Sequence, residues 1–392
     1  MKTFFIDSSS KDNTYGANFW LIVQKLQPGF KNNTTVVKKH GKLDYQGLNN
    51  GGEVIWMKKI RLGIVGCGIA ARELHFPALK ELTDKFEIVA VTSRTRERAE
   101  DFAKLVSETL GSAPQVFNSY EELLLSKQVD AVDLTLPIEL NVPFIKQAVE
   151  HDLHVICEKP VSTDVKSGKE LVEFSLQTNK VIYIAENYRH AFKYNKIREL
   201  LHEGAIGQPI FVDWHLWIGM DKENKYVKTT WRQVPKHIGG FLSDGGVHHV
   251  AALRVMLGDI EWVSGQVKRI TDYLGDVDFL STLFEFKTGV VGNYTVSYAV
   301  KGEEYFEIVG TEGKIRLTPN SIVLSGRVNE EIPLIQENTF KKEFEDFYEV
   351  LTTEKPNILG NPAEALKDLA FFEAAIKSKG EKVEIERLIK EA

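Results

Sequence analysis

The chain has little cysteine, no long apolar run and no excess of positive charge. Its only cysteines, Cys67 and Cys157, are too few for a disulfide framework and are typical of a reducing cytoplasm, so we expect each to be a small buried residue. No apolar segment approaches the roughly 18 residues of a membrane span. A net charge of −6 without a basic run gives no footprint for nucleic acid. The expected partner is therefore a small molecule.

The chain has 392 residues, 43% hydrophobic and 27% charged, which is ordinary for a globular protein with a full core. At about 150 residues per domain this length allows two domains. Residues 1–56 differ from the rest because they are rich in Asn, Gly, Ser and Lys and show no sustained period.

Two explanations for residues 1–56 stay open. The codons of Gly51, Gly52 and Glu53 can spell a purine-rich ribosome-binding sequence just before Met57, so these residues can be a translated leader that is absent from the native protein. Alternatively, they form a partly disordered arm that docks on a partner subunit. We favour the leader, and the intact mass of the natively expressed protein would decide.

Residues 57–186 alternate between short apolar runs and amphipathic segments. Strands are predicted at 61–66, 86–92, 129–136, 154–157 and 180–186, and helices at 69–82, 95–106, 139–150 and 163–178. Such alternation predicts βαβ units and a parallel sheet. We therefore expect a doubly wound α/β domain.

The pattern changes after residue 187. Residues 187–338 predict a helix at 193–203 and then antiparallel strands with alternating faces, including a hairpin that turns near residues 287–289. This indicates a second, α+β domain. Residues 339–392 predict helices: Phe344, Phe347, Tyr348 and Leu351 form one stripe, and Asn361-Pro362 followed by Gly380 marks the bounds of another. We expect these last helices to pack back on the domain interface.

The first βα turn reads GIVGCGIAA, with Gly66, Gly68 and Ala71 in the spacing of the dinucleotide fingerprint. The glycines allow a tight turn and close backbone approach, and the helix N-terminus faces the pyrophosphate. A glycine pattern alone is weak, but this one stands between the first strand and the first helix. We therefore expect it to bind a nucleotide.

The end of the second strand favours NADP over NAD. An NAD-binding domain should have an acid there to bind the ribose hydroxyl, whereas this chain has Ser93 and Arg94, with Arg98 further along. A hydroxyl and a guanidinium suit a 2′-phosphate, which a carboxylate would repel. The alternative is that Arg94 is a solvated loop arginine and that the cofactor is NAD.

The stretch GGFLSDGGVHH places Asp244 and His248 one helical turn apart, with Gly245 and Gly246 between them. Glycine is a poor helix former, so two in succession need a reason. Our hypothesis is that they keep space open for substrate and nicotinamide. The structural alternatives are an acid favoured near a helix N-terminus and a hydrogen-bonded core histidine.

Five motifs in order make the chain resemble the glucose–fructose oxidoreductase/inositol dehydrogenase family (Gfo/Idh/MocA) over residues 57–392. They are GIVGCGIAA, CEKP, AENYRH (185–190), TTWR (229–232) and GGFLSDGGVHH. The resemblance implies a Rossmann domain, a C-terminal domain with a large open, mostly antiparallel sheet, and an active site between them. It also implies self-association through that sheet, as a homodimer or homotetramer.

The resemblance makes Lys159, Asp244 and His248 the expected catalytic residues, which bind the substrate and deprotonate its hydroxyl. The residues alone agree: histidine is the natural base near neutral pH, Asp244 can orient it or bind a neighbouring hydroxyl, and Lys159 can stabilise the reacting oxygen. Further substrate contacts are expected from Arg189, Trp231 and Arg232. The expected cofactor contacts are Gly66, Gly68, Ile69, Ala70, Ser93, Arg94, Arg98, Leu136, Asn141, Glu158, Lys159 and Asn187.

Several other residues are weaker candidates. Trp214, Trp217 and Tyr226 can stack on a sugar ring, although Trp214 and Trp217 face opposite sides of a strand and at most one of them lines the site. His237, His248 and His249 lack a carboxylate or thiolate to complete a ligand set, so we expect no metal. Many family members have an aspartate at the position of Ala251 and a histidine at that of Asn141, which leaves the substrate class open.

Three functions remain in competition. The first is an NADP-dependent oxidoreductase acting on a sugar, polyol or related hydroxy or keto compound. The second is a regulator that binds dinucleotide and metabolite without turnover, which does not need Lys159, Asp244 and His248 together. The third is a redox-cycling glycosidase that holds its cofactor tightly and shows no net hydride transfer. Fold alone does not separate them.

Overall fold

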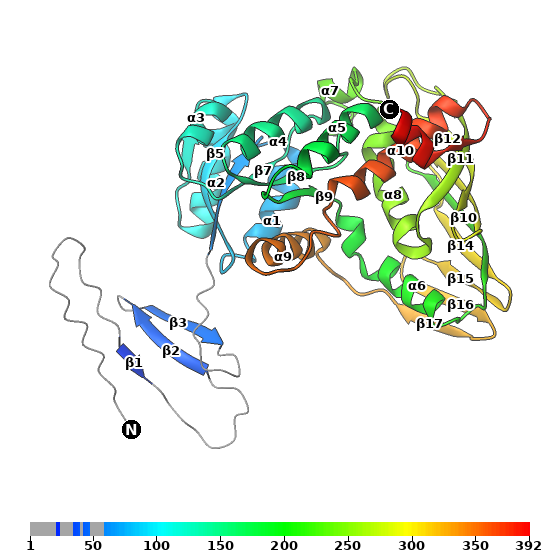
Figure 1. The fold of residues 1–392 in the computed structure, drawn as a ribbon, viewed down its shortest axis with the longest axis horizontal. Helices are drawn as coiled ribbons and strands as arrows, with labels where there is room; N and C mark the ends of the chain where they lie inside the picture. The colour runs from blue at the N-terminus through cyan, green and yellow to red at the C-terminus, as the bar shows by residue number, and fades with distance from the viewer. Residues whose placement is uncertain (1–20, 24–33, 40–41, 48–58) are drawn as a thin grey trace. The chain divides into compact units, whose positions relative to one another are not determined.

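The computed structural model describes residues 21–23, 34–39, 42–47 and 59–392 (Figure 1). The first three ranges are strands β1 (Leu21–Val23), β2 (Thr34–Lys39) and β3 (Lys42–Gly47), which pair in that order as an antiparallel sheet. The leader and arm hypotheses for residues 1–56 concern residues that mostly lie outside the described ranges, so they stay predictions. Residues 59–392 form a compact unit of their own.

The first half of this unit is a six-stranded parallel sheet in the order β6-β5-β4-β7-β8-β9. The order reverses at β4, and in open α/β sheets ligands bind beyond the carboxyl ends of the strands at such a reversal, here β4 and β7. The predicted doubly wound sheet is confirmed. Its strands are β4 (Ile60–Val65), β5 (Phe86–Thr92), β6 (Gln115–Phe117), β7 (Ala131–Leu134), β8 (His154–Glu158) and β9 (Ile182–Ala185).

The first helix differs from the regular helix that the sequence predicts for residues 69–82. It widens into a π-helical segment, η1 (Ala71–His75), before α1 (Phe76–Leu79). Pro77 has no N–H to donate to the carbonyl four residues earlier, so the regular ladder is interrupted there. The remaining helices of this half are α2 (Arg96–Leu110), α3 (Tyr120–Leu125), η2 (Ile138–Leu140), α4 (Asn141–Glu150) and α5 (Val165–Ser175).

The second half contains a nine-stranded, mostly antiparallel sheet in the order β17-β16-β15-β14-β10-β13-β12-β11-β18, as the fold-class prediction requires. Only β10 and β13 pair in parallel among its strands. The strands are β10 (Pro209–Trp217), β11 (Ile260–Lys268), β12 (Phe279–Phe286), β13 (Val291–Ser297), β14 (Tyr305–Gly310), β15 (Gly313–Leu317), β16 (Ser321–Gly326), β17 (Glu330–Pro333) and β18 (Val383–Glu384).

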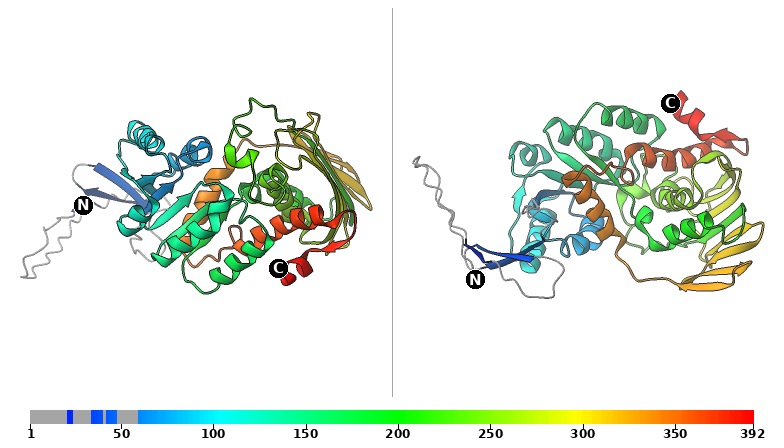
Figure 2. Two further views of the ribbon diagram at one scale, coloured as in Figure 1. Left: turned by 90° about the horizontal axis from the view of Figure 1, so that it is seen from above. Right: turned by 60° about the horizontal axis from the view of Figure 1, so that its bottom comes forward.

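Helices α8 and α10 lie along the same face of this sheet, between it and the Rossmann half (Figure 2). Their apolar side chains merge with those of the sheet in one continuous core. The helices of this half are η3 (Asn187–His190), α6 (Phe192–His202), α7 (Thr230–Gln233), α8 (Phe241–Leu257), α9 (Thr339–Thr352), α10 (Pro362–Ser378) and α11 (Ile385–Glu391).

The two helices predicted near the C-terminus are present. Helix α9 buries Phe344, Phe347 and Tyr348 against Phe86 of the Rossmann sheet. Helix α10 begins after Asn361, whose side chain accepts a hydrogen bond from the Ala363 N–H. A chain segment that follows the second sheet thus returns to the first, and it fixes the two halves against each other.

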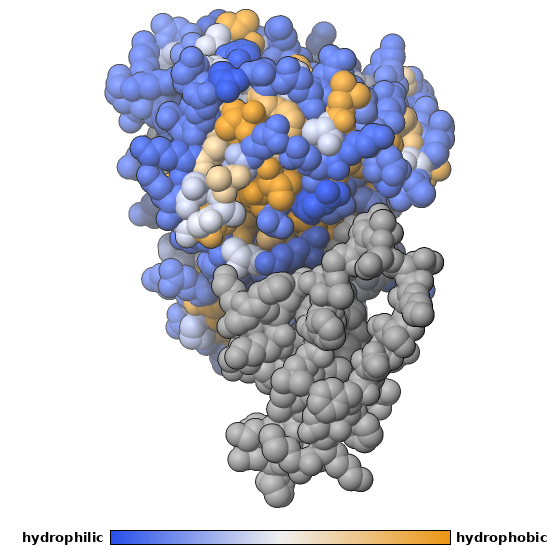
Figure 3. All heavy atoms as spheres, turned by 90° about the vertical axis from the view of Figure 1, so that its left-hand side faces the viewer, coloured by the Kyte–Doolittle hydropathy of each residue, from blue (hydrophilic) through white to orange (hydrophobic). Residues whose placement is uncertain are grey.

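The cysteines and the surface agree with the composition. Cys67 and Cys157 are free and buried, as predicted, and burial raises the pKa of the Cys67 thiol to about 12. Seen from the Rossmann side, polar side chains cover most of the described surface and apolar ones gather near its middle (Figure 3). Among the described residues, no helix is both long and apolar enough to cross a membrane.

Candidate active site

The glycine-rich turn after β4 leaves its backbone open. Gly66 has φ +95°, and a β-carbon there would lie 2.5 Å from the Thr135 carbonyl oxygen, so only glycine fits. A β-carbon on Gly68 would meet no atom within 4 Å. Ile69 and Ala70, which open the helix, are partly exposed. This open cradle at a helix N-terminus fits the pyrophosphate of a dinucleotide.

The turn after β5 carries the positive groups expected beside the adenosine. Ser93 is half-buried, and Arg94 and Arg98 are exposed. Arg72, which sequence reasoning missed, donates from its guanidinium to the Cys67 carbonyl at 3.2 Å and to the Arg98 carbonyl at 3.0 Å. It thereby ties the glycine turn to α2, and its position in the first turn of the first helix was the available signal.

Lys159 leaves the carboxyl end of β8 and reaches α8. Its ammonium group lies 2.7 Å from the Asp244 carbonyl oxygen and 3.5 Å from Asp244 Oδ1. Asn141, predicted to contact cofactor, instead lies behind this loop: it is fully buried, and its Nδ2 donates to the carbonyls of Glu158 at 3.0 Å and Pro160 at 2.8 Å. Asn141 therefore fixes the backbone on both sides of the lysine.

Glu158 is held by a buried histidine below the loop. Its carboxylate lies 3.1 Å from Nε2 of His75, and Nδ1 of that ring lies 2.9 Å from Asp133 Oδ2. Burial opposes charge on His75, but the two carboxylates outweigh it and raise the pKa of the ring well above its usual value. We predicted that Glu158 contacts the cofactor. In the structure its carboxylate is already hydrogen-bonded inside the protein.

Asp244 lies in the first turn of α8 and is buried between two cations. Arg232 donates from Nε to Asp244 Oδ2 at 2.6 Å, and Lys159 approaches the other oxygen. Burial would raise the pKa of this carboxyl, but Lys159 and Arg232 lower it far below its usual value. The Arg232 guanidinium lies over the Trp231 ring, 3.9 Å from its centroid, and 5.0 Å from that of Tyr226. Both rings therefore pack against the Arg232 guanidinium and hold it beside Asp244.

His248 follows one turn later, and its partner is Glu186. Nδ1 of the ring lies 2.6 Å from Glu186 Oε1. The ring also stacks on Tyr188, with centroids 4.7 Å apart and planes 21° apart. Sequence reasoning missed Glu186 and Tyr188, although both stand in the motif AENYRH at the end of β9. Lys159, Asp244 and His248 therefore come together at the carboxyl edge of the Rossmann sheet.

Two family models match the chain with this architecture. One describes an oxidoreductase family with an NAD-binding Rossmann fold and covers residues 60–186; the other describes the GFO/IDH/MocA C-terminal domain and covers residues 194–316. The chain belongs to the Gfo/Idh/MocA family of oxidoreductases.

Solved structures and curated proteins similar to this Gfo/Idh/MocA chain cover most of its length. An oxidoreductase from Thermotoga maritima is 60% identical with a TM-score of 0.81, covering 84% of this chain and 100% of that one. An uncharacterized protein of Saccharomyces cerevisiae is 30% identical over 84% of this chain and 100% of its own length. A D-xylose 1-dehydrogenase (NADP⁺) of Haloarcula marismortui is 26% identical over 75% of this chain and 84% of its own.

Arg189 and Asn187, which we expected to contact substrate and cofactor in this Gfo/Idh/MocA chain, are turned away from the site. The Arg189 guanidinium is buried, forms an ion pair with Asp368 and donates to the Leu359 carbonyl at 3.1 Å, so it is not free to bind substrate. Asn187 is buried, and its Nδ2 donates to Thr339 Oγ1 at 2.7 Å. Leu136, in contrast, is partly exposed beside the Gly66 turn, where its predicted cofactor contact stays a prediction.

The hypothesis for Gly245 and Gly246 is wrong. A β-carbon on Gly245 would overlap the Tyr298 hydroxyl, and one on Gly246 would overlap the Phe372 ring. Protein side chains therefore fill the space that we had assigned to substrate and nicotinamide. The glycines let α8 pack closely against the end of β13 and against α10, which sets the position of Asp244 and His248.

The remaining aromatic and histidine candidates are packed inside the protein. Trp214 is 1% exposed and donates from Nε1 to Glu304, whereas Trp217 is half-buried beside Phe279. His237 bonds the Gly240 carbonyl, and His249 bonds the Tyr294 hydroxyl. Within the described part of the chain, no three His, Cys, Asp or Glu residues are grouped to hold a metal ion.

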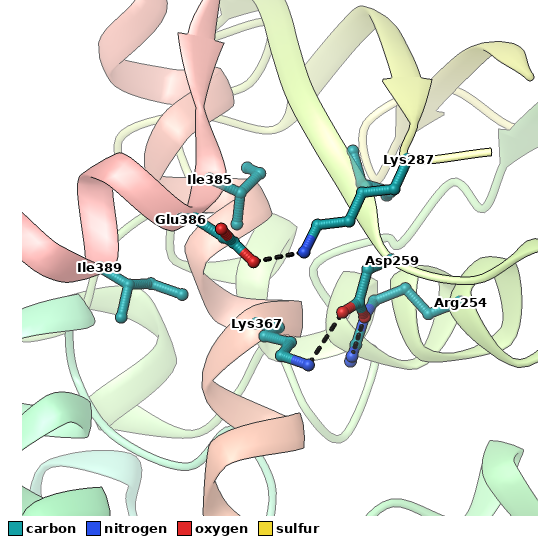
Figure 4. A pocket seen from close by; sticks show the side chains of 8 residues that line it. Arg254, Asp259, Lys287, Lys367, Ile385, Glu386 and Ile389 are labelled. Carbon is teal, nitrogen blue, oxygen red and sulfur yellow. Dashed lines mark hydrogen bonds and ion pairs between the residues drawn. The ribbon is translucent and has the colours of Figure 1, made fainter. Parts of the chain in front are cut away.

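A surface pocket of the C-terminal domain is lined by other residues and does not compete with this site (Figure 4). Its charged groups pair with one another: Lys367 with Asp259 at 2.9 Å, Arg254 with Asp259 at 2.6 Å, and Lys287 with Glu386. Arg254 also pairs with Asp368, the partner of Arg189. This pocket is thus lined by ion pairs that join α8 to α10 and α11 to the turn after β12.

Proposed function

We propose that this chain is an NADP-dependent oxidoreductase that moves a hydride between the nicotinamide and a hydroxyl-bearing carbon of a sugar, polyol or related compound. The observation that carries the proposal is the convergence of Lys159, Asp244 and His248 where the Rossmann sheet meets α8. A cation, an acceptor carboxylate and a ring that can exchange protons meet the chemical needs of alcohol oxidation and of its reverse.

Bound at the Gly66 turn, NADP would supply the hydride chemistry. In the oxidation direction His248 takes the hydroxyl proton, and the Lys159 ammonium group donates a hydrogen bond to the oxygen as its negative charge develops. Asp244, an acceptor because its ionised form is stabilised by two cations, binds a second hydroxyl. In the reduction direction, the protonated ring returns the proton.

Two observations support NADP as the cofactor and a sugar or polyol as the substrate. Ser93 and Arg94 stand where a carboxylate would select NAD, and a hydroxyl with a guanidinium matches a 2′-phosphate. Among the relatives, the enzyme from Haloarcula marismortui is named for D-xylose and NADP⁺. A pair of polar groups beside the lysine suits a substrate with adjacent hydroxyls, which sugars and polyols have.

The test is a spectrophotometric assay of the full chain with NADP⁺ against aldoses, polyols and inositols, and with NADPH against keto-sugars. We expect turnover with one class and a loss of about 10³-fold in Lys159→Met, which keeps the length of the side chain but removes its charge. NADP binding by the variant, measured by calorimetry, should change little.

Other outcomes would point to the competing functions. Tight NADP(H) binding without turnover on any compound would contradict the oxidoreductase and favour a regulator. Cofactor that survives purification, together with cleavage of a glycoside and no net change in absorbance, would favour a redox-cycling glycosidase.

A further inference from the structure

We propose that Glu186 is the positioning residue for His248: it holds the ring so that Nδ1–H donates to the carboxylate and Nε2 is left to exchange the proton with substrate. This inference rests on the proposed function, because it assigns the orienting role within that mechanism to a specific residue. It also replaces the expectation that Asp244 orients the histidine.

Asp244 is not the acid that holds the ring, because the ring bonds Glu186 and the two Asp244 oxygens face cations. One accepts from Arg232 at 2.6 Å and the other lies 3.5 Å from the Lys159 ammonium group. The ring instead meets Glu186 at 2.6 Å, from an element that precedes α8 by more than 50 residues in the chain. The helical spacing of Asp244 and His248 therefore does not reflect a pair.

The Glu186 carboxylate is rigid. It is 2% exposed, it follows β9 directly, and its Oε1 also accepts the backbone N–H of Tyr188 at 3.1 Å. Tyr188 then stacks on the histidine ring. One short segment thus fixes the ring twice, through its edge and through its face. His248 itself keeps 19% of its side chain exposed, and no described residue bonds its Nε2.

Electrostatics sets the tautomer. Burial would raise the pKa of Glu186, but the charges of His248, Arg189 and Lys159 and the His248 hydrogen bond lower it to about 2. A carboxylate that stays ionised can only accept, so Nδ1 must carry the proton. The other groups that face Glu186 or His248 are Glu158, Tyr188, His190, Tyr194, His249, Glu343 and Asp368. Glu343 adds no charge, because burial raises its pKa well above the usual value.

With His248 as the base and Glu186 as its partner, the atoms and charges of the proposed step balance. As the substrate O–H bond breaks, an Nε2–H bond forms, and the C–H electron pair leaves with its hydrogen to NADP⁺, the oxidant. The ring then carries a positive charge, and the Glu186 carboxylate lies against it. An ionised acid in this place both selects the reactive tautomer and stabilises the protonated ring, which is the division of labour between acid and histidine in other enzymes.

The kinetic test compares Glu186→Gln with Glu304→Gln. Glu304 is a matched control because its carboxylate accepts a hydrogen bond from Trp214 Nε1 at 2.9 Å and none from the histidine. We expect Glu186→Gln to lower kcat by about 10²-fold with KM within about threefold, by analogy with the loss of an orienting acid. The acid limb of its rate profile should move to lower pH, since a neutral amide no longer stabilises the protonated ring. Unchanged kcat and an unchanged limb would overturn the proposal.

A second measurement needs no turnover, and its result is read on the unaltered protein. ¹⁵N-histidine spectra of the unaltered protein above pH 9, with the His248 signals identified from His248→Asn, report which nitrogen carries the proton. We expect protonated Nδ1. Protonated Nε2 would overturn the proposal even in an active enzyme, whereas protonated Nδ1 in a protein without turnover would contradict the proposed function and leave the pairing intact.

Discussion

Gly246 is a position at which the packing of this protein requires a residue without a side chain. It lies in α8 between the aspartate and the histidine of the site, and the ring of the fully buried Phe372 occupies the place of its β-carbon. Because the ring is enclosed by core side chains, it cannot move aside without displacing them.

We expect Gly246→Ala to destabilise the fold by about 1–3 kcal/mol, the usual cost of overpacking, although alanine normally stabilises a helix relative to glycine. Urea unfolding would measure the change. Gly246→Ala combined with Phe372→Leu should lose less stability than the sum of the two single changes, because a smaller side chain leaves room for the methyl group. Simple additivity would show that the ring is not the obstacle.

At the same scale, the sequence predicted some site residues and not others. Lys159, Asp244 and His248 could be named because each stands in a recognisable motif, and the structure brings all three together. Glu186 could not be paired with His248, because the contact joins two segments far apart in the chain. Arg189 stands in the same motif as Glu186, yet it turns to Asp368 because a buried carboxylate offers it a stronger partner than solvent.

Among the elements, the turn between β5 and α2 carries the arginine that we propose to select NADP. Arg94 is exposed and forms no ion pair with any residue that the structure describes, whereas Arg96 is engaged by Glu100 at 2.7 Å and by Asn118. The two arginines therefore form a natural comparison between a free cation and a paired one on the same turn.

We expect Arg94→Gln to weaken NADP binding about tenfold and to leave NAD binding unchanged, because only NADP carries the 2′-phosphate; tenfold corresponds to about 1.4 kcal/mol, within the range of a charged hydrogen bond. Arg96→Gln should change neither. Calorimetric titration of both variants with both cofactors provides the measurement. An equal loss for NAD and NADP in Arg94→Gln would rule out phosphate recognition by this side chain.

The elements themselves were largely predictable because hydrophobic period distinguishes strands from helices. Five of the six Rossmann strands and the stripe of α9 lie where the periodicity indicates, whereas the short strand β6 was not predicted. The first helix was mispredicted as regular because the effect of Pro77 on its ladder depends on how the chain accommodates the lost bond. The order of the nine strands could not be derived from the sequence, because β10 pairs with β13 and β14, which lie far from it in the chain.

For the whole molecule, buried histidines make stability depend on pH. His249 is 6% exposed and bonds the Tyr294 hydroxyl at 2.8 Å. Burial, with the neighbouring charge of His248, lowers its pKa to about 3. The ring is therefore neutral in the folded protein over a range in which the unfolded chain takes up a proton.

The direction in which stability changes with pH follows from this difference in protonation between the folded and the unfolded chain. Below about pH 6.5 the unfolded chain binds more protons, so the contribution of His249 is complete above that pH and is lost as the pH falls toward 3, by at most about 1.4 kcal/mol per pH unit. Urea unfolding of the intact protein and of His249→Gln at pH 7, 6 and 5 measures the slope. We expect a flatter slope in the variant; equal slopes would mean that other groups carry the dependence.

The two ends of the nine-stranded sheet affect how the protein behaves at high concentration. An unprotected edge is a template on which another molecule can add a strand, and repeated addition seeds aggregates. Here one edge is β17, which carries Glu330, Glu331 and Pro333, and the other is β18, which is only two residues long. Charge, proline and brevity each disfavour strand addition. These features disfavour continuation of the sheet into a neighbouring molecule through either edge.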